Sequence, residues 1–207
     1  MRVFIALELP LEIIEEIKKI QKLIWKKTLF SGKLTESENL HLTLKFLGEI
    51  EDLSKKANSD ALFHSSSPNP KSKSEGFGEN KIEEIKKKLG EIKLNSFEAF
   101  VGEVGVFSRK FIKIIWIKLN GKGVFSLQKE IDEKLKDLFK PEERFMSHIT
   151  IARVKYVNDK KGLLNYLKSV KPEAKKFKIE KFFLKKSELM PEGPVYSDIE
   201  EYKLEIT

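Results

Sequence analysis

A short pattern of alternating polar and apolar residues occurs once in each half of this chain, as "HLTLKFLG" from His41 and as "HITIARVK" from His148. Successive side chains of a β-strand point to opposite faces of the sheet. Each copy therefore predicts a strand with a histidine and a threonine on one face and branched apolar residues on the other. The apolar faces must pack against a core, so the fold has to contain two strands that are buried on one face and open to a ligand on the other.

Hydrophobic periodicity predicts the elements around these two strands. Strands are expected at residues 2–9, 40–47, 92–107 and 111–119, in the second histidine motif, and on both sides of the turn at 191–194. Helices are expected at residues 13–24, 82–89, 127–138 and 160–169. Strands and helices do not alternate in a regular crossover rhythm, which favours an α+β fold with antiparallel sheets. If the two halves pack as pseudo-symmetric lobes, the polar faces of both motifs line one cleft.

Composition limits the class of protein. A chain of 207 residues without cysteine is long enough for one substantial domain and excludes disulfides, thiol nucleophiles and cysteine-ligated metals. No apolar run is long enough to span a membrane and no secretory signal is recognisable, so a cytoplasmic protein without a membrane partner is expected. The net charge of +8 favours anionic partners such as nucleic acids, although many lysines alternate with glutamates on helical faces.

Residues 54–80 differ in composition from the rest of the chain. Serine, proline and glycine are frequent there and few apolar residues are available for burial, which predicts a loop insertion within a single domain spanning residues 1–207. The third histidine, His64, belongs to this segment and has no recognisable partner in sequence. We therefore expect His64 to be a solvated loop residue and the chemistry to reside in the two patterned strands.

Two imidazoles and two hydroxyls on facing strands suit acid–base chemistry at phosphorus. The ordinary pKa of histidine, about 6.5, allows one ring to accept a proton while another donates one. The threonine hydroxyls of Thr43 and Thr150 can donate hydrogen bonds to phosphate oxygens. A metal site is the competing use of His41 and His148, but strand alternation brings no Asp or Glu to their faces, so neither a metal nor another cofactor is expected.

The paired motifs resemble those of the two-histidine phosphoesterase superfamily. More narrowly, "MRVFIALELP", "ENLHLTLKFLGEI", "HITIARVK" and "LKKSELMPEGPVY" are similar in order and spacing to the RNA 2′,3′-cyclic phosphodiesterases, also called 2′-5′ RNA ligases. The resemblance covers nearly the whole chain outside residues 54–80. It implies two pseudo-symmetric α+β lobes whose antiparallel sheets form a central groove, with helices on the outer faces. It also implies metal-independent hydrolysis of 2′,3′-cyclic phosphate RNA ends to 2′-phosphomonoesters.

The resemblance also assigns roles to residues. His41 would donate a proton to the leaving 3′-oxygen, His148 would activate water, and Thr43 and Thr150 would hold the phosphate. Arg153 would contact the phosphate as well, although strict alternation places it on the face opposite His148 unless the strand contains a bulge.

Two further residues of the first motif are candidates for substrate binding. Lys45 shares the face of His41 and Thr43 by alternation, which makes it a cation available to the phosphate. Phe46 occupies the position equivalent to Arg153 and would offer a ring to a base or ribose if it turned into the groove; a core position is the other interpretation.

Other functions remain compatible with the sequence. Within the enzymes these are a 2′-5′ RNA ligase and a phosphodiesterase acting on a small cyclic nucleotide. A non-catalytic RNA-binding module, in which the histidines only contact phosphates, is the alternative from another class. In each case we expect a monomer.

Overall fold

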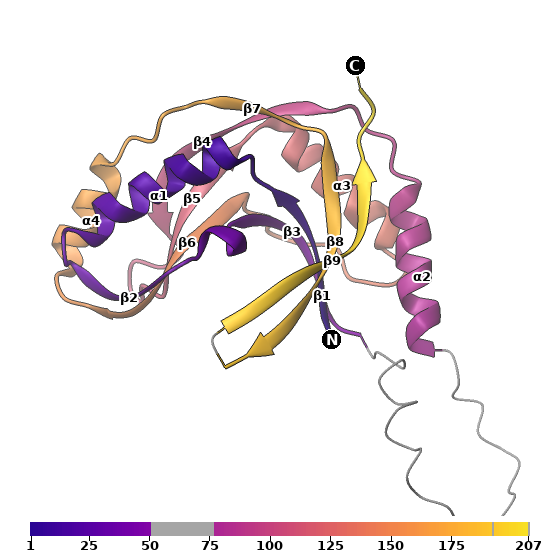
Figure 1. The fold of residues 1–207 in the computed structure, drawn as a ribbon, viewed down its shortest axis with the longest axis horizontal. Helices are drawn as coiled ribbons and strands as arrows, with labels where there is room; N and C mark the ends of the chain where they lie inside the picture. The colour runs from indigo at the N-terminus through magenta and orange to yellow at the C-terminus, as the bar shows by residue number, and fades with distance from the viewer. Residues whose placement is uncertain (51–76, 192, 207) are drawn as a thin grey trace, which may run out of the picture.

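Antiparallel strands form a single curved sheet in the computed structural model, which describes residues 1–50, 77–191 and 193–206 (Figure 1). The strands are β1 (Arg2–Glu8), β2 (Phe30–Leu34), β3 (His41–Glu49), β4 (Phe97–Val106), β5 (Ile114–Asn120), β6 (His148–Val157), β7 (Lys176–Ile179), β8 (Lys181–Met190) and β9 (Gly193–Lys203). The helices are α1 (Leu11–Trp25), α2 (Phe77–Gly90), α3 (Lys122–Leu135) and α4 (Lys160–Ser169), with a 3-10 turn at Ser37–Asn39. The α+β class predicted from the sequence is confirmed.

The strand order places the two histidine strands at the centre of the sheet. The order is β7-β4-β5-β6-β3-β1-β8-β9, with β2 paired to β6. β3 and β6 pair through one residue pair, Leu42 with Ile149. On either side of this junction the order is symmetric, because β6 is followed outward by β5 and β4 just as β3 is followed by β1 and β8. We call the two halves the β3 lobe (β1, β3, β8, β9) and the β6 lobe (β2, β4, β5, β6, β7).

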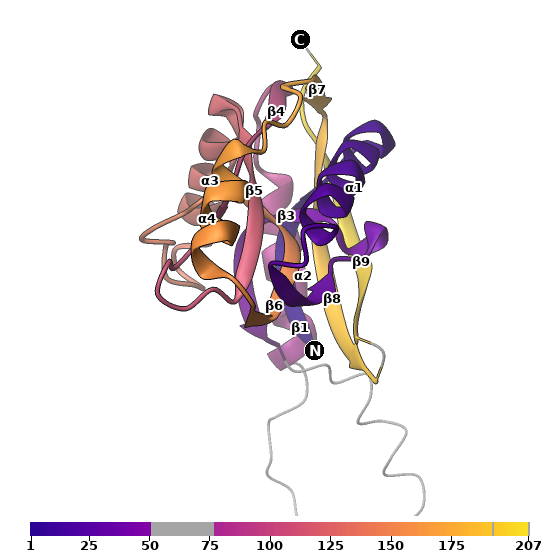
Figure 2. The ribbon, with the colours of Figure 1, turned by 90° about the vertical axis from the view of Figure 1, so that its left-hand side faces the viewer.

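The helices cover the outer faces of the two lobes. α1 packs on β6 and α4 on β4, whereas α3 packs on both β3 and β4, and α2 packs on α3 and β9 (Figures 1 and 2). α1 buries Ile13, Ile17, Ile20 and Ile24, spaced three or four residues apart, as predicted for an amphipathic helix. The apolar residues of both motifs, Leu42, Leu44, Ile149 and Ile151, are fully buried beneath these helices. The opposite, polar face of the central strands is therefore left open.

Most predicted elements are confirmed, and the differences have local causes. β2 and β7 were not expected, because β2 contains only two apolar residues and β7 is four residues long. Gly32 in β2 permits a close approach to β6, since a Cβ there would lie 2.0 Å from the Arg153 carbonyl oxygen. β4 begins at Phe97, later than predicted, and α3 ends at Leu135. None of the described helices is long and apolar enough to cross a membrane.

The predicted loop insertion at residues 54–80 falls largely outside the described residues. Its last four residues, 77–80, belong to the first turn of α2. The prediction of a loop is therefore wrong for these four residues. His64 lies outside the described part of the chain.

Candidate active site

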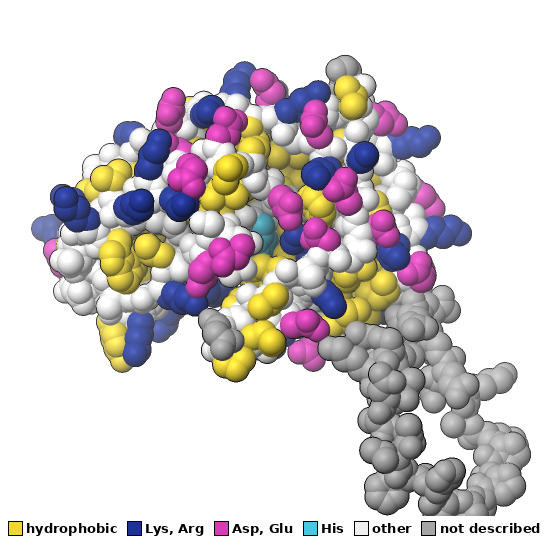
Figure 3. Space-filling model, in the orientation of Figure 1, with side chains coloured by type: hydrophobic (Ala, Val, Ile, Leu, Met, Phe, Trp, Pro, Cys, Tyr) yellow, Lys and Arg dark blue, Asp and Glu magenta, His cyan; other side chains and the backbone are white. Residues whose placement is uncertain are grey.

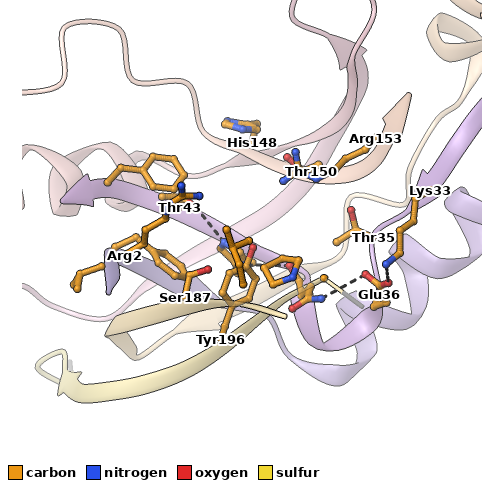
Figure 4. A pocket seen from close by; sticks show the side chains of 18 of the residues that line it. Arg2, Lys33, Thr35, Glu36, Thr43, His148, Thr150, Arg153, Ser187 and Tyr196 are labelled. Carbon is orange, nitrogen blue, oxygen red and sulfur yellow. Dashed lines mark hydrogen bonds and ion pairs between the residues drawn. The ribbon is translucent and has the colours of Figure 1, made fainter. Parts of the chain in front are cut away.

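The polar faces of β3 and β6 line one groove between the lobes. It has a volume of about 640 Å³ and opens onto the face shown in Figure 3, where histidine is visible at the bottom of a hollow. Its walls come from β1, β2, β3, β6 and the β8–β9 hairpin. The side chains from the two motifs are His41, Thr43, Phe46, His148, Thr150 and Arg153. Both imidazoles and both threonines predicted from the sequence therefore meet at one site (Figure 4).

Each imidazole is oriented by a backbone carbonyl two residues earlier in the chain. His41 Nδ1 lies 2.9 Å from the Asn39 carbonyl oxygen, and His148 Nδ1 lies 2.7 Å from that of Met146. A carbonyl oxygen only accepts hydrogen bonds, so Nδ1 carries the proton in both neutral rings. In each ring Nε2 is then the nitrogen available for proton transfer.

Aromatic rings fix the position of both imidazoles. The His41 ring contacts both Phe4 and Tyr196, with centroid distances of 5.2 and 5.1 Å, and these two rings also contact each other. The His148 and Phe107 rings pack in a T-shaped arrangement, with their centroids 4.7 Å apart. His41 Nε2 also lies 3.1 Å from Thr43 Oγ1, within the same motif. These contacts hold the rings at defined angles before any substrate enters.

The surroundings of His41 favour its neutral form. Burial lowers the pKa of His41 to about 4, and the nearby positive charges of Lys185 and Arg153 act in the same direction, while the bond to the Asn39 carbonyl opposes them. His41 is therefore unprotonated at pH 7 in the free groove. A bound anion between His41 and these cations would favour the protonated ring.

This lowered pKa predicts a loss of stability in acid. Between pH 6.5 and pH 4 the unfolded chain binds a proton at His41 that the folded protein excludes, so the free energy of unfolding falls as the pH falls through this window. On lowering the pH from 7 to 4.5, the free energy of unfolding of the His41→Asn variant should fall by about 2–3 kcal/mol less than that of the unsubstituted protein. Urea unfolding at both pH values measures this difference. Thr43→Val, which keeps the imidazole, is the control, and parallel pH dependences in His41→Asn and the unsubstituted chain would contradict the assignment.

A bulge in each motif strand turns the residue five places after the motif histidine into the groove. In the β1–β3 pairing the register moves from Ala6 opposite Thr43 to Ile5 opposite Lys45, so Leu44 is the extra residue. In the β5–β6 pairing it moves from Trp116 opposite Thr150 to Ile115 opposite Ala152. Beyond each bulge the alternation is inverted. Phe46 and Arg153 consequently line the groove, and Phe46 is 72% exposed.

The same bulge removes Lys45 from the groove. Lys45 is 2% exposed and its Nζ lies 2.5 Å from Asp132 Oδ1 and 2.7 Å from the Lys140 carbonyl oxygen. The side chain points to the helix-covered face, toward α3. The placement of Lys45 beside His41, predicted from strict alternation, is therefore wrong.

Several residues of the groove were not identified as site residues from the sequence. They are Phe4 and Tyr196 beside His41, Phe107 beside His148, and Lys33, Thr35 and Glu36 opposite Arg153 (Figure 4). Phe4 and Tyr196 lie in "MRVFIALELP" and "LKKSELMPEGPVY", two of the stretches that carry the family resemblance. That resemblance was the signal available for these two residues. Lys33 in β2, and Thr35 and Glu36 just after it, carried no such signal, because they lie outside these stretches and β2 was not predicted.

The fold is shared with other proteins of known structure. The apo structure of LigT from E. coli superposes with a TM-score of 0.68 at 20% identity, covering 98% of this chain and 96% of that one. The crystal structure of TT0787 from Thermus thermophilus gives a TM-score of 0.67 at 24% identity, covering 98% and 97%. At these identities the comparison concerns the fold alone.

Sequence comparison defines the family. Residues 7–78 and 118–196 match the model of the LigT-like phosphoesterases. The RNA 2′,3′-cyclic phosphodiesterase of Methanocaldococcus jannaschii is 33% identical over 205 residues, covering 98% of this chain and all of the relative. The protein of the same name from Thermotoga maritima is 29% identical, covering 99% of this chain and 96% of the relative. This chain belongs to the LigT-like phosphoesterase family, as its motifs indicated.

Proposed function

We propose that this protein hydrolyses the 2′,3′-cyclic phosphate at the end of an RNA chain to a 2′-phosphomonoester, using His41 and His148 as acid and base. The observation that carries the proposal is the presence of both imidazoles in one groove, each with Nδ1 bonded to a backbone carbonyl and Nε2 left for proton transfer. The curated relatives named RNA 2′,3′-cyclic phosphodiesterase support the choice of substrate.

The reaction divides the proton transfers between the two rings. His148 Nε2 accepts a proton from a water molecule as the water oxygen attacks phosphorus. The bond between phosphorus and the 3′-oxygen breaks, and protonated His41 donates its Nε2 proton to that oxygen. The products are a free 3′-hydroxyl and a 2′-phosphomonoester, and solvent restores both protonation states. This division of roles follows the family resemblance.

The low pKa of His41 is compatible with the acid role once substrate is bound. The cyclic phosphate carries one negative charge and would lie among His41, His148 and Arg153. Its charge opposes the repulsion that Lys185 and Arg153 exert on a protonated His41. Binding of the substrate phosphate would thus raise the pKa of His41 and favour the protonated form that acts as the acid. Thr43, Thr150 and Arg153 donate hydrogen bonds to the non-bridging oxygens as charge develops.

Product analysis tests the proposal. A short RNA with a 2′,3′-cyclic end should yield only the 2′-phosphomonoester, identified against 2′- and 3′-phosphate standards by chromatography. The rate should be unchanged by EDTA, because both proton transfers are assigned to side chains. A 3′-phosphate product, or loss of activity in EDTA, would contradict the mechanism. Parallel reactions with an added 5′-hydroxyl RNA and with small cyclic nucleotides distinguish ligation and nucleotide hydrolysis from the proposed activity.

A further inference from the structure

A second cavity, outside the groove, is lined by basic side chains. It has a volume of about 370 Å³ and lies between the β4–β5 loop and α4. We call it the basic cleft; its lining residues are Arg109, Lys160, Lys161, Leu164, Asn165 and Lys168. None of these residues is acidic. The adjacent carboxylate of Asp159 accepts the Gly162 N–H at 2.9 Å and so caps α4.

The positive charges of the basic cleft are not neutralised within the described part of the chain. Many other lysines of that part form ion pairs, as Lys175 does with Glu12 at 2.6 Å and Lys176 with Glu98 at 2.8 Å. In the basic cleft the one polar contact of a cation is Lys160 Nζ with the Lys110 carbonyl oxygen at 3.3 Å, which leaves its charge unpaired. Lys160 and Lys161 also occupy the first turn of α4, where the helix dipole disfavours cations. A bound anionic ligand would offset both the repulsion among these unpaired cations and their unfavourable interaction with the helix dipole.

The β4–β5 loop connects the basic cleft to His148. Phe107 at the start of the loop contacts the His148 ring, and Arg109 two residues later lines the basic cleft. Two residues span at most about 7 Å between Cα atoms, so Phe107 beside His148 and Arg109 in the basic cleft lie close together on this loop. Ser108 Oγ accepts the N–H groups of Lys110 and Phe111, both at 3.2 Å, which gives the loop a defined turn.

The same loop presents an aromatic ring next to the cations. Phe111 is 67% exposed, and Lys110 Nζ lies 5.5 Å from the centre of its ring. Exposed aromatic rings among cations are the features that bind unpaired bases and the backbone of single-stranded nucleic acids.

We propose that the basic cleft binds backbone phosphates of the single-stranded RNA on the 5′ side of the reacting end, with Phe111 stacking on one of its bases. This inference rests on the proposed function, because it assumes that the RNA end lies at His148. The basic cleft then contributes affinity for oligonucleotides without taking part in the chemistry. A mononucleoside cyclic phosphate is too short to reach it.

Charge removal at α4 tests this proposal. The cleft variant carries K160Q, K161Q and K168Q, exposed positions where glutamine has a helix propensity similar to that of lysine. The control variant carries K87Q, K122Q and K129Q, which remove the same charge from exposed positions on α2 and α3. For a 12-nucleotide RNA with a 2′,3′-cyclic end, KM should rise about tenfold in the cleft variant and stay unchanged in the control variant. For a mononucleoside 2′,3′-cyclic phosphate, both variants should retain the original KM and kcat.

Direct binding separates this proposal from the proposed function. Fluorescence anisotropy with a 12-nucleotide RNA ending in a 3′-hydroxyl requires no turnover. The slope of log Kd against log salt should decrease in magnitude by about 2 in the cleft variant, from three lost phosphate contacts. F111A should weaken binding and leave the slope unchanged. If the unsubstituted protein hydrolyses neither substrate, the proposed function fails while this assay still tests the basic cleft; equal RNA affinity in the cleft and control variants would overturn the cleft proposal.

Discussion

Replacement of His148 by alanine is expected to lower kcat by about 10³-fold for an RNA with a 2′,3′-cyclic end. A positioned general acid or base contributes roughly 10²–10⁴ to a rate, and the other imidazole of the described residues, His41, is assigned to the other proton transfer. His41→Ala should have a comparable effect, because the proposed mechanism assigns one of the two proton transfers to each ring. The measurement is single-turnover kinetics at saturating enzyme.

Two observations distinguish a catalytic loss from a structural one. The affinity for a 3′-hydroxyl RNA should change less than about threefold in either variant, since binding rests on the phosphate contacts and on the charge of the surface. His64→Ala, the same substitution at the remaining histidine, should retain full activity. Retention of turnover in His41→Ala or His148→Ala would refute the paired acid and base, and an accompanying loss of RNA affinity would favour a binding module.

Much of the site could be predicted because it depends on local periodicity. Alternation along a strand depends only on the geometry of the extended backbone, so the common face of His41 and Thr43, and of His148 and Thr150, follows from the sequence. The meeting of the two motifs required the lobes to pack as pseudo-symmetric halves, which the strand order bears out.

The bulges mark the limit of prediction from alternation. The extra residues, Leu44 and Ile151, are apolar and continue the alternation after Thr43 and Thr150, so nothing in the hydrophobic pattern marks a bulge. Their effect appears only in the pairing of β3 with β1 and of β6 with β5, which are contacts between distant parts of the chain. For this reason the family resemblance identified Arg153 as a groove residue where strict alternation did not.

Because Lys45 points away from the groove, its ammonium group is buried in an ion pair with Asp132. Removing one member of this pair should strongly lower the free energy of unfolding. Asp132 accepts hydrogen bonds from Lys45, from Gln128 at 2.7 Å and from the Glu142 N–H at 2.9 Å. Burial acts to raise the pKa of Asp132, but these bonds outweigh it and the pKa is lowered, so the carboxylate stays charged at pH 7. Lys45→Met would leave that buried charge without its cation.

We expect Lys45→Met to reduce the free energy of unfolding by about 3–5 kcal/mol, the usual cost of removing one partner of a buried ion pair. Urea unfolding at pH 7 measures it. The double variant Lys45→Met/Asp132→Asn should recover part of the loss, because asparagine is uncharged and still accepts the Glu142 N–H. Lys129→Met, at an exposed position on α3, should change stability by less than about 0.5 kcal/mol. A phosphate-binding Lys45 would behave differently: Lys45→Met would then raise KM and leave stability nearly unchanged, and that outcome would restore the placement of Lys45 in the groove.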